Sequence, residues 1–149
     1  MRVRLHPEAG VTLMELMIVV VIVGILAAIA YPSYTQFVMQ TNRTDATKTM
    51  QLAAQSMERC YSVNFTYVGC NVGPIAVVDT STINTPNGFY TITFAIPDAQ
   101  DYTLSAVPIA APQTGDNRCW TFTLASTGQV GALDITGTIN TTLTCWGSK

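Results

Sequence analysis

Apolar residues fill the N-terminal part of the chain almost without interruption. Between Val11 and Ala30 the only ionisable side chain is Glu15. Gly24 is the only break in the apolar run over residues 16–30. A helix of about 20 mainly apolar residues is long enough to cross a bilayer core. Because this segment is apolar on every side, the pattern predicts a helix surrounded by lipid or by other helices.

The pattern changes to that of an amphipathic helix between Ser33 and about Tyr61. Mainly apolar residues recur there at spacings of three and four. They are Tyr34, Phe37, Val38, Thr41, Ala46, Met50, Ala53, Met57 and Tyr61. The other side of this segment is polar and charged. We therefore expect the N-terminal helix to continue to residue 61 and to lay this stripe against a sheet.

Three later segments alternate apolar and polar residues with a period of two. They are residues 89–96, 102–107 and 120–125, and threonine or serine fills many of the polar positions. This pattern predicts an antiparallel sheet with one apolar face. Residues 62–88 are rich in Asn, Gly, Pro and Thr and predict a connecting loop. The predicted fold class is α+β, with a long N-terminal helix packed on a small antiparallel sheet.

The charge content argues against nucleic-acid binding. Charged residues make up 11% of the chain, against roughly 25% in typical soluble proteins. Without residues 1–10, five basic and eight acidic side chains remain, for a net charge of −3. The positive charge that attracts phosphates is largely missing, so we expect no nucleic-acid partner.

The histidine content argues against an enzyme. The single histidine, His6, lies within the first ten residues. The remainder therefore has no Ser-His-Asp or Cys-His arrangement and no His-containing zinc site. Asp98 and Asp101 could be read as paired carboxylates or calcium ligands, but turn residues are the simpler interpretation. We expect no catalytic residue, no cofactor and no metal.

The cysteines predict two disulfides, because the chain has an export-type N-terminus and no C-x-x-C pair. They are Cys60, Cys70, Cys119 and Cys145. Of three possible connectivities we favour Cys60–Cys70 and Cys119–Cys145, since each joins neighbours along the chain. If the second bridge lies on the outer face of the sheet, Trp120 and Trp146 should both point toward the helix.

One interpretation of the N-terminus is an ordinary signal peptide. Arg2 and Arg4 precede the apolar run and favour a cytoplasmic N-terminus. The segment Ala28-Ile29-Ala30 fits a cleavage site of the A-x-A type. The remainder would then be a secreted binding module or enzyme. Glu15 and the nearby Pro32 argue against this interpretation.

A longer motif supports a different interpretation. Gly10, Thr12, Leu13, Glu15, Leu16 and Met17, followed by the run to Ala30, Tyr31 and Pro32, resemble the prepilin signature of type IV pilins. The resemblance implies that a prepilin peptidase cuts between Gly10 and Val11 and that Val11 becomes the N-methylated first residue. Glu15 would be the carboxylate required for assembly. Gly24 and Pro32 would allow a kink, or unwinding in the filament. Val11 and Met14 differ from the usual phenylalanine and isoleucine.

Glu15 also has a physical rationale in this scheme. Cleavage would create an α-amine at Val11, one helical turn away. In a filament the carboxylate could meet the amine of a neighbouring subunit. A buried charge without its partner is strongly unfavourable, so a wrong axial register would be penalised.

The resemblance implies a type IV pilin fold in three parts. Residues 1–10 would be the leader, and residues 11–61 the long helix, with 11–31 as transmembrane segment or filament core. Residues 62–149 would form a globular region with a connecting loop, the sheet and a C-terminal loop closed by a disulfide, as in type IV pilins.

The implied function is that of a structural pilus subunit, a PilE-like minor pilin or a major pilin, supporting adhesion or twitching motility. Its partners would be other pilins, the prepilin peptidase, the assembly platform of the inner membrane and, before assembly, membrane lipid. It would be a single-pass inner-membrane protein with a periplasmic globular region, and later part of an extracellular pilus. The nearest alternative is a type II secretion pseudopilin, which shares the N-terminus but often uses calcium in place of the C-terminal disulfide.

Overall fold

The computed structural model describes residues 10–147 of the 149-residue chain. The leader expected at residues 1–10 therefore lies, except for Gly10, outside the described residues. The chain divides into two compact units, residues 1–36 and residues 37–149. We call residues 37–147 the head.

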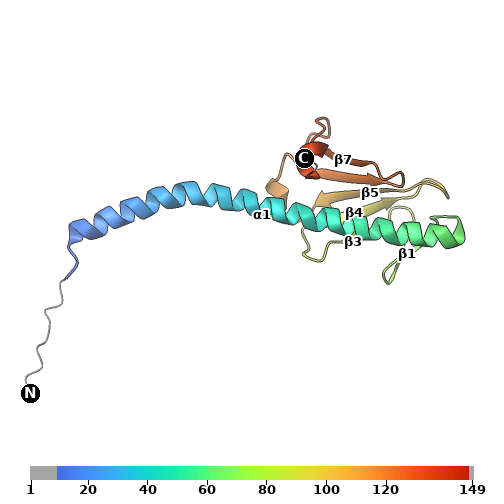
Figure 1. Cartoon of the computed structure of the whole chain (residues 1–149), viewed down its shortest axis with the longest axis horizontal. Coiled ribbons are helices and arrows are strands. Elements are labelled where there is room, and N and C mark those ends of the chain that lie inside the picture. Colours follow the sequence, from blue (N-terminus) through green and yellow to red (C-terminus); the bar gives the residue numbers. More distant parts are fainter. Residues whose placement is uncertain (1–9, 148–149) are drawn as a thin grey trace, which may run out of the picture. The chain divides into compact units, whose positions relative to one another are not determined.

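One helix, α1 (Leu13–Asn64), runs through both units (Figure 1). It is helical through Gly24 and Pro32, both of which lie within its first half. Unwinding at these residues in a filament stays a prediction. The predicted end of the helix at about residue 61 lies within one turn of the observed end.

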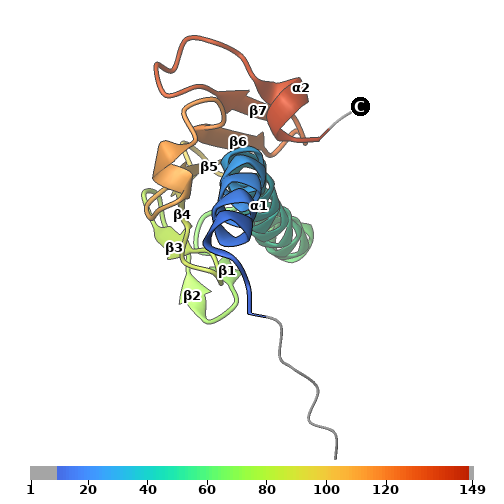
Figure 2. The same cartoon turned by 90° about the vertical axis from the view of Figure 1, so that its left-hand side faces the viewer.

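The head contains a two-stranded hairpin and a five-stranded antiparallel sheet, with strands in the order β3-β4-β5-β6-β7. The hairpin consists of β1 (Asn71–Val72) and β2 (Ile75–Ala76), and the sheet of β3 (Thr82–Asn84), β4 (Tyr90–Ala95), β5 (Thr103–Pro108), β6 (Thr121–Ala125) and β7 (Val130–Leu133). A 3-10 turn, η1 (Gln113–Gly115), and a short helix, α2 (Thr142–Cys145), complete it. The strands lie on one side of the second half of α1 (Figure 2). The α+β prediction is confirmed.

Two strands of the sheet, β3 and β7, escaped the sequence analysis. Both are short, and β7 contains Gly131, which breaks the apolar alternation. Gly131 pairs with Thr123 of β6. A Cβ atom at Gly131 would collide with the Thr123 hydroxyl. A larger residue at this position would therefore force the Thr123 side chain to move.

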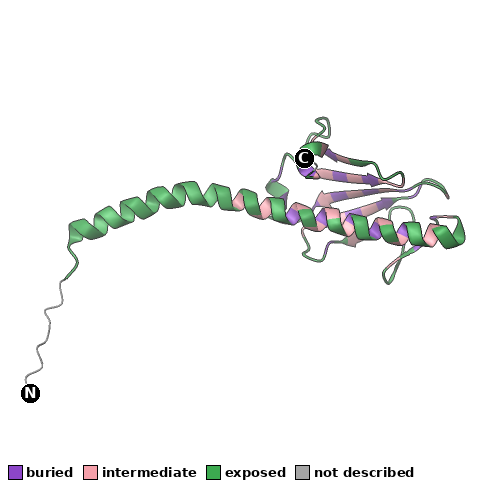
Figure 3. Cartoon of the chain, viewed as in Figure 1, coloured by how far each residue is buried: buried purple, intermediate pink, exposed green. Residues whose placement is uncertain are grey.

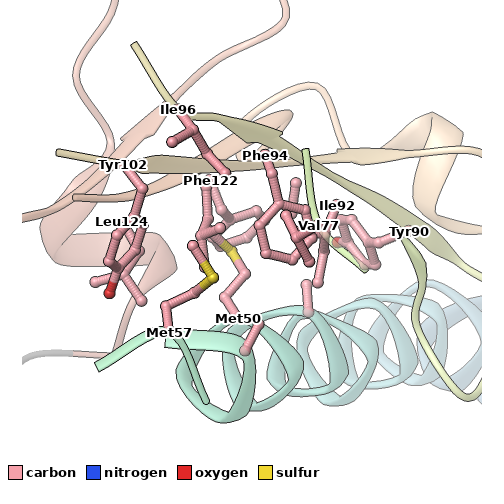
Figure 4. Packing of buried hydrophobic residues seen from close by; sticks show 14 of the residues in the cluster. Met50, Met57, Val77, Tyr90, Ile92, Phe94, Ile96, Tyr102, Phe122 and Leu124 are labelled. Carbon is pink, nitrogen blue, oxygen red and sulfur yellow. The ribbon is translucent and has the colours of Figure 1, made fainter. Parts of the chain in front are cut away.

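The core lies between α1 and the inner face of the sheet. Four predicted helix residues, Ala46, Met50, Ala53 and Met57, are buried. Figure 3 shows that the buried positions of α1 lie in the part of the helix beside the strands. In Figure 4, Met50 and Met57 point toward aromatic and aliphatic side chains of the strands. Those that are fully buried include Tyr90, Ile92, Phe94, Leu104 and Phe122. The alternation over β4, β5 and β6 is confirmed.

The N-terminal end of the predicted stripe was assigned wrongly. Tyr34 is 67% exposed and Phe37 is 68% exposed, and Thr41 is exposed as well. Asn42 is buried instead. Phe37 lies nine residues before buried Ala46, which places it on the opposite side of a helix with 3.6 residues per turn. The register of the core, set by Ala46 and Met50, leaves Phe37 facing outward.

Candidate functional site

The N-terminal half of α1 has no contact with a core. Its large apolar residues from Leu13 to Ile29 are between 52% and 77% exposed. Within the described residues, α1 is the one helix long and apolar enough to cross a membrane. Such exposure of aliphatic surface marks a membrane or protein interface.

Glu15 lies in the first turn of this helix. Thr12 precedes the helix, and its hydroxyl accepts a hydrogen bond from the N–H of Glu15 at 3.2 Å. This hydrogen bond is the threonine half of a capping box, and the glutamate also favours the positive end of the helix dipole. The sequence motif T-x-x-E could have predicted this cap. Gly10 and Val11, the expected cleavage site, lie before the helix and are exposed.

A buried polar network ties η1 and its flanking loop to α1. Arg43 donates two hydrogen bonds to Asp116, from Nε at 2.6 Å and from Nη2 at 2.8 Å. The Arg43 side chain is 17% exposed and that of Asp116 is 3% exposed. Asp116 Oδ1 also accepts the N–H of Cys119 at 3.3 Å. The ion pair thus connects the helix to the start of the C-terminal disulfide loop.

Gln113 extends this network into the core. Its side-chain amide donates to the Tyr90 hydroxyl at 2.7 Å and to the Met39 carbonyl at 3.2 Å. Its Oε1 accepts from Asn42 Nδ2 at 3.2 Å. Every polar atom of this fully buried side chain therefore has a partner. Burial raises the pKa of Tyr90 to about 12, although the hydrogen bond from Gln113 opposes the shift.

Glu58 organises a second polar contact near the end of α1. Its carboxylate accepts the hydroxyls of Tyr67, at 2.9 and 3.1 Å, and of Tyr102, at 3.0 Å. The Tyr67 ring stacks on Tyr61 and meets Tyr102 edge to face. Burial, reinforced by the bond to Glu58, raises the pKa of Tyr67 to about 12 and raises that of Tyr102 as well. These tyrosines hold the connecting loop and β5 to the helix.

The disulfide pairing is confirmed, as Cys60–Cys70 and Cys119–Cys145. The expected orientation of the second bridge is wrong, because Cys119 and Cys145 are buried in the core and do not lie on an outer face. Trp146 nevertheless packs edge to face on Phe122. Its Nε1 donates to the Gly131 carbonyl at 2.6 Å. Trp120 is half-buried and lies outside the core cluster.

Asp134 orders the loop that follows β7. It accepts the Thr136 hydroxyl at 2.8 Å and the N–H groups of Thr138 and Ile139 at 3.3 and 3.2 Å. Desolvation disfavours its ionised form, but these hydrogen bonds outweigh that effect and lower the pKa of Asp134. The carboxylate therefore serves the loop itself.

The head offers few further candidates for a metal site or a nucleic-acid site. Among the described residues, no group of three or more His, Cys, Asp or Glu side chains could hold a metal ion. The exposed basic residues of the described range are Lys48, Arg59 and Arg118, while Arg43 is paired with Asp116. Asp98 accepts the N–H groups of Gln100 and Asp101 within its own turn, as expected of a turn residue.

Two protein-family models match the chain. One, described as type IV minor pilin ComP, DNA uptake sequence receptor, covers residues 32–123, more than half of the chain. The other, the prokaryotic N-terminal methylation motif, covers residues 5–31. A comparison with curated proteins found no match.

Proposed function

We propose that this chain, which belongs to the type IV minor pilin family, is processed at Gly10, held in the inner membrane by residues 11–31, and then extracted into a pilus. Membership makes it a pilin subunit that assembles with other pilins. One observation carries the rest of the proposal: the N-terminal half of α1 is apolar and exposed along its whole length. Lipid covers such a surface before assembly and neighbouring helices cover it afterwards.

Processing is the first step of this proposal. A prepilin peptidase cuts between Gly10 and Val11, and the new N-terminus is methylated. Both residues lie ahead of the helix and are exposed, as a protease substrate requires. The methylation-motif match over residues 5–31 supports this assignment.

Glu15 is the assembly residue of the proposal. In the free chain its backbone N–H is capped by Thr12, and the described residues supply its carboxylate with no ion-pair partner. A neighbouring subunit's N-terminal amine would supply that partner. In an apolar filament core the unpaired carboxylate would disfavour any other axial register.

Mass spectrometry of protein from its native host tests the processing step. We expect an N-terminal peptide that begins at methylated Val11, and an intact mass that rises by four hydrogens when the two disulfides are reduced. A chain that begins at Tyr31 would overturn the pilin proposal and favour a secreted domain with an ordinary signal peptide.

Glu15→Gln tests the assembly step, because the amide keeps the size of the side chain and removes its charge. We expect processed protein to accumulate in the membrane and to be lost from sheared pili. Asp98→Asn, which removes a turn carboxylate from the head, is the control for a change of one charge. Normal incorporation of the Glu15 variant would refute the assembly role.

The family match favours a pilus over a type II secretion pseudopilus. The C-terminal region is also closed by the Cys119–Cys145 bridge, the feature expected of the pilus subunit. The proposal also includes a low abundance of this subunit in the pilus and a role in adhesion and twitching motility. Abundance is measured in sheared pili, and motility is measured in a deletion strain.

A second function, binding of DNA uptake sequences, is favoured by the family description alone. It runs against our expectation from charge that nucleic acid is not a partner. The exposed basic residues in the described range number three: Lys48, Arg59 and Arg118. If the head binds DNA, most of its contacts must therefore be uncharged hydrogen bonds or stacking.

Salt dependence of binding tests this second function sharply. Each neutralised phosphate contributes a slope of about −0.9 to log K against log salt, so three cations allow a slope no steeper than about −3. Fluorescence anisotropy should compare duplex DNA that carries the host's uptake sequence with a scrambled duplex. Equal binding of both duplexes, or none, would refute a receptor role.

A further inference from the structure

Strand β7 forms one edge of the five-stranded sheet, and residues 139–146 cover that edge. We call these residues the C-terminal segment. Its helix, α2, lies beside β7 in Figure 2. The N–H of Ala132 donates to the Thr142 hydroxyl at 2.8 Å, and the Ala132 carbonyl accepts the N–H of Thr141 at 2.9 Å. Both backbone groups of Ala132 that face away from β6 are therefore occupied by the chain's own C-terminal segment.

Two further contacts extend this cover along β7. The N–H of Asp134 donates to the Ile139 carbonyl at 3.2 Å, and the Trp146 indole Nε1 donates to the Gly131 carbonyl at 2.6 Å. An uncovered edge strand is a template for a strand from another chain, and proteins usually block it with charged residues or proline. Strand β7 has the sequence Val-Gly-Ala-Leu and contains neither. Protection of this edge therefore depends on the C-terminal segment.

The C-terminal segment has few apolar contacts that hold it in place. Ile139 is 60% exposed and Leu143 is 77% exposed. Helix α2 has four residues, far fewer than an isolated helix needs to be stable. The segment enters the core only at its end, through Trp146 and through Cys145, which is buried in its bridge to Cys119. The disulfide is therefore the main attachment of the cover.

We propose that the outward edge of β7 is a strand-pairing surface for a second copy of this chain, and that the Cys119–Cys145 bridge keeps it closed by holding the C-terminal segment on it. This pairing goes beyond assembly into a pilus, because it occurs between heads that lack the bridge. The outward groups of Ala132 allow a twofold arrangement, in which the Ala132 residues of two antiparallel β7 strands exchange both hydrogen bonds. Val130 of one copy then lies opposite Asp134 of the other.

Site-specific photocrosslinking identifies what lies on the edge. Val130 and residues 140–144 line one groove of about 490 Å³. Benzoylphenylalanine in place of Val130, in the full-length chain in its native host, should therefore join the C-terminal segment of its own chain. In the Cys119→Ala/Cys145→Ala variant, we expect the same probe to join residues 129–134 of a second copy.

The variant Cys60→Ala/Cys70→Ala is the matched control, because it also loses one disulfide but leaves the cover of β7 in place. Its probe at Val130 should give adducts within one chain. Absence of adducts between copies in the variant without the Cys119–Cys145 bridge, or equal amounts of them in both variants, would overturn the proposal. Adducts scattered along the second copy would also overturn it, since they indicate contact between unfolded chains.

Charge at Val130 tests the register of the pairing. Without the Cys119–Cys145 bridge, Val130→Lys places a cation opposite Asp134 of the second copy, and Val130→Asp places a second anion there. Opposite charges on neighbouring strands stabilise a pair and like charges destabilise it. We expect native mass spectrometry of full-length protein in detergent micelles to show at least about threefold more dimer for Val130→Lys and threefold less for Val130→Asp. The same change in both variants, or no change, would overturn the proposal.

A matched pair of threonine variants tests the cover while the bridge is in place. Thr142→Val removes the hydroxyl that accepts the Ala132 N–H, whereas Thr144→Val changes an exposed residue of the same helix. We expect hydrogen exchange at the Ala132 amide of the full-length chain, followed by NMR, to be about tenfold faster in Thr142→Val. It should be unchanged in Thr144→Val. Unchanged exchange in Thr142→Val would show that the C-terminal segment does not cover the edge, and would overturn the proposal.

Discussion

The ion pair between Arg43 and Asp116 offers the sharpest test of how the head is held together. The two residues are 73 positions apart in sequence and form the contact that fastens the η1 loop to α1. We consider Asp116→Asn, which keeps an oxygen acceptor for the Cys119 N–H and removes the charge. Arg43→Met and the double variant complete a thermodynamic cycle.

The expected loss of folding free energy follows from the burial of the pair. Removing one partner of a buried ion pair costs about 3–5 kcal/mol, because the other charge is left without compensation. Arg43 is 17% exposed, so its guanidinium recovers some hydration, and we expect Asp116→Asn to cost about 3 kcal/mol. Asp116 is 3% exposed, and we expect Arg43→Met to cost at least as much, about 3–4 kcal/mol. The double variant removes both charges and should cost less than either single variant.

Urea denaturation of the oxidised head, followed by tryptophan fluorescence, measures all four free energies of unfolding. Residues 37–149 suffice because the core and both disulfides lie within them. A coupling energy of at least about 3 kcal/mol is expected, because the two single losses add to more than twice the loss of the double variant, and added salt should change it little, since a buried pair is poorly screened. If the losses of the two single variants add up to the loss of the double variant within about 0.5 kcal/mol, the pair does not hold the loop.

Three further predictions concern the stability of the same head. Replacing Cys119 and Cys145 with alanine should lower the free energy of unfolding by about 3–4 kcal/mol from the 26-residue separation alone, measured against the oxidised head; a loss below 1 kcal/mol would contradict it. Stability should fall as pH rises from about 10 to 12, because unfolded tyrosines ionise near 10 whereas burial raises the pKa of Tyr90 to about 12; Tyr90→Phe should flatten this decline, and an unchanged profile would exclude a role for Tyr90. Met50→Ala should cost about 2–5 kcal/mol, while Leu52→Ala, at a residue 63% exposed, should change stability by less than about 0.5 kcal/mol; similar costs would mean that the register of α1 is wrong.

Local pattern was sufficient for much of this protein. The apolar run, the change of period after Ser33 and the alternation in β4, β5 and β6 all depend on residues close together in the chain. The disulfide pairing followed from chain order as well. The assembly role that we propose for Glu15 came from a resemblance, and the cap of its N–H by Thr12 could have been predicted from the same residues. These features depend on repeats of 3.6 or two residues, which a sequence displays directly.

The contacts that close the head could not be read in this way. Gln113 gives no local sign that it will satisfy Tyr90, and Glu58 gives none that two tyrosines will donate to it. The same holds for the short strand β7, whose Gly131 leaves room for the Thr123 side chain across the sheet. In each case the two partners lie far apart in the chain, and only the fold brings them together.

The sequence by itself determined that this chain has an exposed apolar helix, a helix-on-sheet architecture and two disulfides. Tertiary structure alone decided which side of α1 faces the sheet, and hence that Phe37 points outward and Asn42 inward. Helical period places a stripe on a helix but does not select which of two overlapping stripes is buried. Packing of Ala46, Met50 and Met57 against the strands makes that choice, because rotating the helix would take these side chains out of the core.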